Sequence, residues 1–431
     1  MRLIRLLKRD LARETRDWVQ EGLVEQRQAE AICARYGVDY RSPDGHGYGV
    51  LVVLGYLFIG LALLTLVGAN WEEIPRWLRT AGLLSLVLVA NGLGLRSFLA
   101  GRTRPAVAWF FLGSLFYGTA IMLIAQIYHL GEHYPDGILW WALGVLPFAM
   151  LLGSGLLTGL MLVLAYTWFL VETGLDFFPL LFPLFLAAAG YYLWQQGRSA
   201  VIFLGSVAGV VLYAEYALAW WLADRPGFVF APENLLLGIG LLLLLQAGGQ
   251  WLAARRGPTA GDYGVLLQLW VLRVFVLLLL LLSFRSPWAE LYRAGWVQPA
   301  FAVGIALSCS LLALALLRTA AQSLLPMLLG VTIYLGMLGA LMFAPQDPGA
   351  LWLQVGANLV LVGLGTWLIV RGIVAHQSHV FYTGVGSILT TALLRYFDLV
   401  GDYVGAAILF AVFAAILLGA ARFWKSREAG L

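Results

Sequence analysis

Residues 49–98 decide the fold, and they read GVLVVLGYLFIGLALLTLVGANWEEIPRWLRTAGLLSLVLVANGLGLRSF. Two apolar runs, at about 49–69 and 79–98, flank one short polar break. An α-helix rises about 1.5 Å per residue, so a run of about 20 residues crosses a hydrocarbon core about 30 Å thick. The stretch therefore predicts two membrane-spanning helices that reverse direction at VGANWEEIPRW, residues 67–77.

The same alternation of apolar runs and short polar breaks continues along the chain. We count fourteen candidate spans, near 49–69, 79–98, 106–128, 138–153, 155–171, 179–194, 199–222, 233–252, 263–282, 299–317, 324–343, 351–370, 379–396 and 403–421. Only LLGSGLLTG separates the fourth span from the fifth, so these two could instead form one re-entrant hairpin. The sequence thus predicts an all-α polytopic transmembrane bundle of about 14 spans (12–14).

The composition excludes a water-soluble fold. The 431 residues are 61% hydrophobic and only 12% charged, about half of the charged fraction usual in soluble domains. The aromatic residues, 13% of the chain, suit belts at the two membrane interfaces. Cys33 and Cys309 are too far apart in sequence to suggest a framework or a metal cluster, so we expect both to be packing residues.

The basic residues predict the orientation. If the N-terminus is cytoplasmic, twenty Lys and Arg fall in cytoplasmic segments and six outside, with Arg273 inside a span completing the 27. This asymmetry follows the positive-inside rule and predicts that both termini are cytoplasmic in a bacterial inner membrane. Because the net charge of +4 follows loop position, no nucleic-acid partner is expected.

The ends of the chain differ from the apolar middle. Residues 1–46 are charged and lack the apolar core of a cleavable signal. They place Leu3, Leu7, Leu11 and Trp18 near one helical stripe and are interrupted at Gly22. We interpret 1–46 as a cytoplasmic amphipathic helical hairpin, on the lipid surface or docked to a partner. Residues 47–421 form the transmembrane domain, and 422–431 a cytoplasmic basic tail.

Small residues mark faces for close helix packing, because they let backbones approach where no hydrophobic force separates helix from lipid. The candidate pairs are Ser114 with Gly118, Gly205 with Gly209, Gly336 with Gly339, and Gly363 with Gly365.

Ionisable and polar groups within the spans are candidates for a substrate or ion pathway, because a charge in the bilayer centre costs at least about 2.5 kcal/mol. Glu215 and Arg273 could form a buried structural pair. Alternatively, Glu215 is a proton or cation site, or Arg273 binds an anionic group. Gln246, Gln268, Gln354 and Asn358 either form interhelical hydrogen bonds or line a wet groove.

A second candidate site lies at the outer ends of the first three spans. Asn70, Trp71, Glu72 and Glu73 are expected to face Gln126, Tyr128, His129 and His133. Two histidines and two carboxylates would permit a metal site or acid–base chemistry. The simpler interpretation is an interfacial turn. No HExxH pattern, phosphate loop or dinucleotide fingerprint is present, so no catalytic residue, metal or cofactor is assigned.

Several of these motifs resemble one family. The charged hairpin, the first span ending GANWEEIPRWLR, and the segments FYGTAIMLIAQIYHLG and ILWWALG are similar to DUF2157, bacterial polytopic membrane proteins without a settled activity. The likeness covers about residues 5–170, with LLRYFDLVGDY near 394–403 also similar. Its matching positions are Asn70, Trp71, Pro75, Gly118, Gln126, Tyr128, His129 and Trp140. Some relatives are encoded beside a membrane-anchored protein with a GDYxxLxY motif, which implies a protein partner.

Three functions remain open. A secondary transporter or lipid-linked-substrate flippase fits the number of spans and the buried charges. A non-catalytic scaffold or partner subunit of an envelope complex fits the hairpin and the lack of catalytic motifs. An intramembrane transferase or hydrolase would depend on the outer cluster alone. A continuous polar cavity lined by Glu215, Arg273, Gln246 or Gln354 would favour transport, whereas the same side chains sealed in dry contacts would favour the scaffold.

Overall fold

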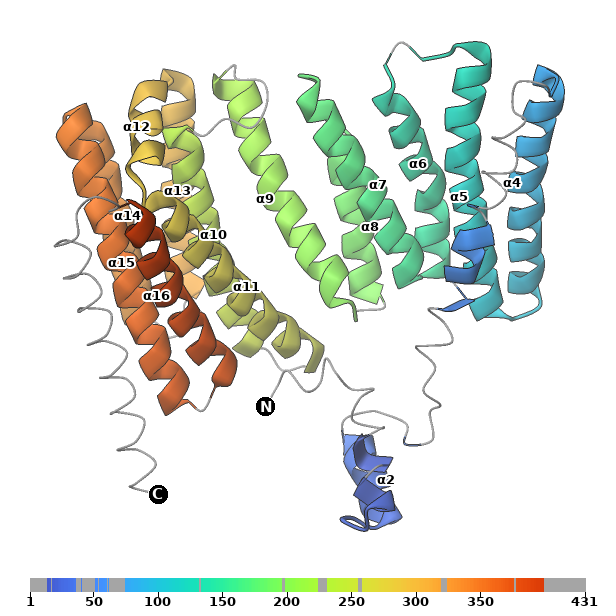
Figure 1. Ribbon diagram of the computed structural model, residues 1–431, viewed down its shortest axis with the longest axis horizontal. Coiled ribbons are helices and arrows are strands. Elements are labelled where there is room, and N and C mark those ends of the chain that lie inside the picture. The colour runs from blue at the N-terminus through green and yellow to red at the C-terminus, as the bar shows by residue number, and fades with distance from the viewer. Residues whose placement is uncertain are drawn as a thin grey trace. The chain divides into compact units, whose positions relative to one another are not determined.

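The structure is a computed structural model. It describes residues 14–16, 18–35, 40, 51–52, 54–59, 61, 74–131, 133–195, 198–223, 231–254, 258–318, 324–375 and 377–398. Within these residues every regular element is a helix and no strand occurs (Figure 1). The predicted all-α polytopic bundle is therefore confirmed.

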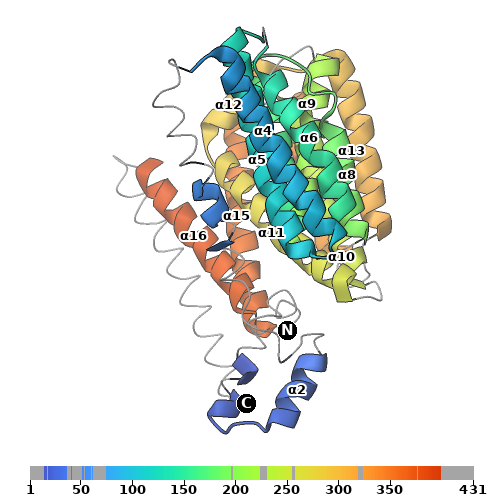
Figure 2. The same ribbon diagram turned by 90° about the vertical axis from the view of Figure 1, so that its right-hand side faces the viewer.

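The helices belong to two compact units. Unit 1 contains Met1–Phe228 and Ala253–Leu266, and unit 2 contains Val229–Leu252 and Leu267–Leu431. The helices of unit 1 are α2 (Gln26–Arg35), α4 (Arg76–Leu99), α5 (Thr103–Tyr128), α6 (Pro135–Leu152), α7 (Gly155–Gly174), α8 (Phe182–Gln195) and α9 (Ala200–Ala223). In both views α4, α5 and α6 lie side by side in chain order (Figures 1 and 2).

Unit 2 is built from seven further helices, and the first residues of one of them, α11, belong to unit 1. They are α10 (Pro232–Ala254), α11 (Pro258–Leu282), α12 (Arg285–Ala294), α13 (Gln298–Arg318), α14 (Leu324–Phe343), α15 (Gln346–Val374) and α16 (Ser378–Asp398). Eleven of the described helical segments are apolar. Nine are long enough to cross a membrane, and 327–343 and 380–395 are shorter.

Each of the twelve spans predicted between residues 79 and 396 coincides with one helix. The first predicted span lies mostly, and the last wholly, outside the described residues. The fourth and fifth spans are the separate helices α6 and α7, which break at Gly153 with a φ of 52°. Their 18 and 20 residues correspond to about 27 and 30 Å, so each is long enough to cross the membrane by itself.

Helix α12 is the element that the sequence analysis missed. It has only ten residues, RSPWAELYRA, with Pro287, Trp288 and Leu291 buried. A short amphipathic helix between two spans lacks the long apolar run used to find the others. It follows the end of α11 directly and packs against α15.

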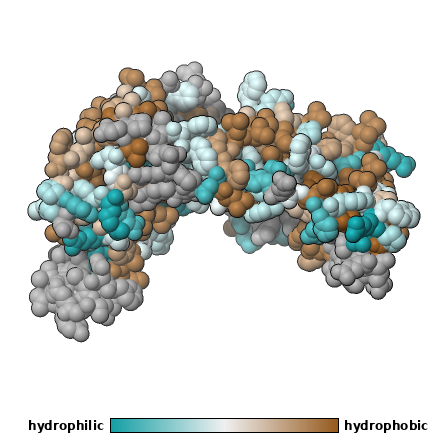
Figure 3. Space-filling model, turned by 90° about the horizontal axis from the view of Figure 1, so that it is seen from above, coloured by the Kyte–Doolittle hydropathy of each residue, from teal (hydrophilic) through white to brown (hydrophobic). Residues whose placement is uncertain are grey.

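Apolar residues are exposed over much of the described surface, and Figure 3 shows them interspersed with polar residues on the face seen from above. Leu88, Leu151 and Val201 are each more than 70% exposed. A soluble protein rarely leaves such large apolar areas open. The core of unit 1 combines aliphatic and aromatic residues, with Phe169, Phe182, Phe185 and Tyr216 among its fully buried side chains.

The predicted small-residue faces have different outcomes. A Cβ at Gly118 would lie 2.1 Å from the Trp141 ring, and one at Gly209 would lie 2.6 Å from Leu186. Gly365 similarly packs against Ser387 and Ile388, so close packing is confirmed at these three positions. Gly336, Gly339 and Gly363 face open space, with nothing within 4 Å of an added Cβ. The prediction was wrong there.

The described part of the N-terminal segment contains two helical stretches joined by a turn at Gly22, where φ is +75°. The Thr15 hydroxyl and the Cys33 thiol are 3.1 Å apart and buried between them. Cys33 is therefore a packing residue, as expected, whereas Cys309 is exposed. The hairpin's membrane side and the domain limits at residues 46 and 421 stay predictions.

Candidate functional site

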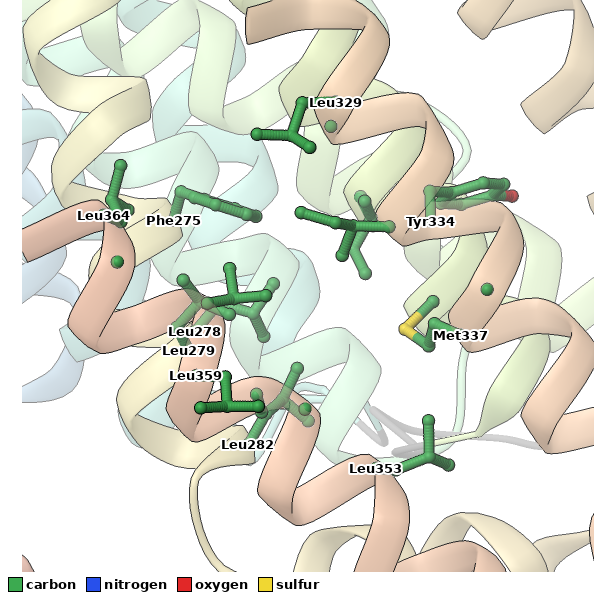
Figure 4. Close-up of a pocket in the computed structure, with 18 of the residues that line it drawn as sticks. Phe275, Leu278, Leu279, Leu282, Leu329, Tyr334, Met337, Leu353, Leu359 and Leu364 are labelled. Atoms are coloured by element: carbon green, nitrogen blue, oxygen red, sulfur yellow. The ribbon is translucent and has the colours of Figure 1, made fainter. Parts of the chain in front are cut away.

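A large apolar pocket lies within unit 2 and is lined by side chains of α10, α11, α12, α14 and α15. It has a volume of about 960 Å³, which is near the upper end of the range for ligand sites in proteins. Phe275 from α11 and Leu329 from α14 point toward one another across it (Figure 4). The other lining residues include Leu243, Leu278, Leu279, Leu282, Trp288, Gly330, Ile333, Gly336, Met337, Trp352, Leu353, Gly356, Leu359, Val360, Gly363, Leu364 and Trp367.

Missing side chains create this space. Gly336 on α14 and Gly356 and Gly363 on α15 all line the pocket, and a Cβ at any of them would meet no atom within 4 Å. Since each glycine removes a side chain from a helix that otherwise carries leucine and valine, the two helices leave a groove between them.

The pocket is long and almost entirely apolar. Along α15 its lining runs from Trp352 to Trp367, a rise of about 22 Å. That exceeds one leaflet of a hydrocarbon core about 30 Å thick. Tyr334 supplies a hydroxyl group, and its oxygen points away from the α11 side chains (Figure 4). The remaining lining residues carry no charge.

A polar cluster lies at the C-terminal end of α11. The last carbonyls of a helix have no intrahelical partner, and in lipid they must bond elsewhere. The Ser283 hydroxyl donates to Leu280 O at 2.6 Å, and the Trp288 indole donates to Leu282 O at 2.7 Å. The Asn358 amide donates to Ser283 O at 2.9 Å.

Arg395 of α16 joins this cluster. Its Nη2 donates to the Ser283 hydroxyl at 3.3 Å, and its guanidinium lies 4.5 Å from the Phe284 ring centroid. Arg395 is only 8% exposed. Asn358 also donates to Gln354 O at 2.8 Å, so the amide of Asn358 ties α15 to the end of α11. Neither Asn358 nor Gln354 is among the pocket-lining residues.

Unit 1 holds a separate histidine–carboxylate pair. His133 Nε2 lies 2.9 Å from Glu172 Oε2. His133 directly precedes α6, and Glu172 lies in the last turn of α7. The predicted alternation of spans puts these two positions at the same membrane side, and the contact agrees with that. It does not show which side.

The two charges predicted within the spans fall in different units. Glu215 lies on α9 of unit 1 with Oε1 buried. Arg273 lies on α11 in unit 2, exposed, with its guanidinium 5.2 Å from the Trp270 ring centroid. The Glu215–Arg273 pair therefore stays a prediction. Gln246 and Gln268 are part-buried on α10 and α11 and are not among the pocket-lining residues.

The predicted outer cluster is only partly described. Asn70, Trp71, Glu72 and Glu73 lie outside the described residues. Thr80 at the start of α4 donates to the Tyr128 hydroxyl at 3.3 Å, which brings the end of the 67–77 stretch and the end of α5 together. Gln126 is exposed, and His129 terminates α5 in the left-handed conformation.

Among the described residues, no group of three His, Cys, Asp or Glu side chains could hold a metal ion. The carboxylate that meets His133 is Glu172, which the sequence analysis did not single out. The signal that could have identified Glu172 is its position as an ionisable residue near the end of the apolar run MLVLAYTWFLVETG. Ser283 and Trp288 had no comparable signal, because their role depends on where α11 ends.

These features define a polytopic helical membrane protein with a large apolar pocket among its described helices. Residues 16–158 match a family described as "Predicted membrane protein (DUF2157)". The match confirms the resemblance over that segment, about a third of the chain, which ends before the pocket of unit 2 begins. No curated protein and no solved structure matches the chain.

Proposed function

We propose that this protein binds the apolar chain of a membrane lipid or lipid-linked substrate in the unit 2 pocket, as a flippase of the bacterial inner membrane. One observation carries the proposal: an apolar pocket of about 960 Å³ lined by five helices. In a bilayer the molecules available to fill such a space are lipid chains. The length of about 22 Å along α15 suits an extended chain better than a compact solute.

The placement of the polar side chains supports a lipid rather than a hydrophilic substrate. Gln246, Gln354 and Arg273, the residues expected to line a polar pathway, do not line the pocket. Ser283, Asn358 and Arg395 are likewise not among the pocket-lining residues, so the pocket suits the apolar chain of a lipid.

The scaffold function is the second candidate, and a different observation favours it. Asn358 donates both to Ser283 O and to Gln354 O, so this polar group within the spans serves helix packing. A scaffold would use the pocket for structural lipid and would act through a partner, for which a membrane-anchored protein is our proposal.

A photo-crosslinking experiment tests lipid binding. The full-length chain carries p-benzoylphenylalanine at position 336 in vesicles of phosphatidylethanolamine and phosphatidylglycerol, and lipid adducts are identified by mass spectrometry. Gly339 is the matched control, since it lies on the same helix, also faces open space and does not line the pocket. We expect abundant, stoichiometric adducts at 336 and sparse adducts at 339. Equal labelling would indicate ordinary surrounding lipid and would refute a specific site.

Pocket-filling variants separate a flippase from a scaffold. Gly336→Phe places an aromatic ring in open space, so we expect the chain to fold as well as Gly339→Phe does. If the pocket carries substrate, Gly336→Phe lowers the rate at which a fluorescent phospholipid or polyprenyl phosphate crosses reconstituted vesicles, and Gly339→Phe does not. Loss of adducts without any change in lipid movement would reject the flippase and leave the scaffold.

A further inference from the structure

The pair of His133 and Glu172 lies outside the pocket and has no part in the proposed lipid binding. It joins the beginning of α6 to the end of α7 through one contact of 2.9 Å. The side chains of His133 and Glu172 are 25% and 11% exposed. The histidine is thus open to protons from solvent, whereas the carboxylate is mostly covered.

The turn after α7 holds the pair in place. The ring centroids of Phe177 and His133 are 4.4 Å apart. The Phe177 N–H donates to Glu172 O at 3.1 Å, and Phe177 O accepts from the Tyr216 hydroxyl at 3.2 Å. Asp176 has a φ of 61°, which is uncommon for a residue other than glycine. Helices α7 and α9 therefore fix the ring that covers His133.

The chemistry of the pair depends on protons. A largely buried carboxylate is costly unless it is paired, and histidine is the side chain that ordinarily changes charge between pH 5 and 8. A histidine that donates from Nε2 to a carboxylate presents Nδ1 as its second ring nitrogen. Protonation at Nδ1 turns a hydrogen bond into a charge-assisted ion pair, which is the stronger contact.

We infer that His133 and Glu172 form a proton-binding site, which ties the adjoining ends of α6 and α7 together more tightly when His133 carries both ring protons. Other titratable groups stand on the surrounding elements. They are His129 at the end of α5, Asp136 in the first turn of α6, Asp176 after α7, and Glu215 and Tyr216 on α9. Of these, His129 is the other histidine and supplies the matched control.

A double-mutant cycle measures the contact directly. His133→Gln, Glu172→Gln and the double variant of the full-length chain are unfolded in detergent micelles at about pH 5.5 and about pH 8, on either side of the usual histidine range. We expect the coupling between the two side chains to be about tenfold larger, as a ratio of unfolding equilibrium constants, at the lower pH. His129→Gln should leave that difference in place.

Equal coupling at both pH values would overturn the inference and identify a structural hydrogen bond that does not respond to protons. If the variants do not fold, amide exchange in the wild-type chain decides. After correction for the intrinsic rates, residues 174–178 should exchange more slowly at about pH 5.5 than at about pH 8. Unchanged protection would again contradict the inference. The proposed lipid binding is tested in unit 2 with other variants, so either proposal can fail alone.

Discussion

Replacing Gly384 by alanine tests a close backbone contact within unit 2, between α15 and α16. A Cβ at Gly384 would lie 2.7 Å from the carbonyl oxygen of Gly365 and 2.8 Å from the backbone nitrogen of Ile369. Carbon and oxygen atoms without a bond do not approach this closely, and both neighbours belong to a helix backbone. The two helices would have to separate, since no flexible side chain can move aside.

The expected cost follows from two opposing effects. Adding a methyl group to a packed interface costs about 1–3 kcal/mol, and backbone-to-backbone overlap puts Gly384→Ala at the upper end. Removing a glycine from a helix returns up to about 1 kcal/mol. We therefore expect Gly384→Ala to lower the free energy of unfolding by about 2 kcal/mol.

Gly386→Ala is the matched control. Gly386 lies two residues further along the same helix, is exposed, and has nothing within 4 Å of an added Cβ. Gly386→Ala gains helix propensity, and its Cβ overlaps no neighbouring atom. The free energies of unfolding of the two variants should therefore differ by about 3 kcal/mol. The assay is unfolding of each full-length variant by SDS titration in mixed micelles, followed by circular dichroism. Equal stability of the two variants would show that α15 and α16 do not pack this closely.

Three other substitutions have defined outcomes. Gly118→Ala should destabilise unit 1 by about 1–3 kcal/mol relative to Gly92→Ala. The Cβ at position 118 would meet the Trp141 ring, whereas Gly92 faces open space. Thermal unfolding in micelles compares the two variants. Trp288→Ala should cost about 3–5 kcal/mol, since the side chain is 2% exposed; wild-type stability by SDS titration would contradict the packing of α12. Burial raises the pKa of the Tyr292 hydroxyl above 10. The unfolded tyrosine therefore ionises first and stability falls as pH rises above about 10; unfolding titrations at pH 9 and above should show a smaller loss in Tyr292→Phe.

The candidate site could be predicted only in part. Sequence reasoning predicted that His133 lies at an end of the spans and meets a carboxylate, and the structure pairs it with one. It chose Glu72 and Glu73 as partners because they lie in a conspicuous polar turn, whereas the structure pairs His133 with Glu172. His133 and Glu172 are 39 residues apart in the sequence, and no periodicity within one span indicates which ends meet.

The pocket could not be predicted from the sequence, because it depends on which glycines face a neighbouring helix and which face open space. Gly363 and Gly365 both looked suited to close packing. They are two residues apart and so point about 200° apart around α15. One faces Ile388 of α16 and the other faces the pocket.

The amino-acid sequence by itself determined that this chain folds into a bundle of membrane-crossing helices. Each apolar run is long enough to cross the hydrocarbon core, and lipid requires every backbone polar group to bond within its own segment. Tertiary structure alone decided which glycines are covered and which leave a cavity, where α11 ends, and which carboxylate meets His133. These outcomes depend on how each helix is rotated toward its neighbours, and that rotation is set by side-chain packing between distant segments.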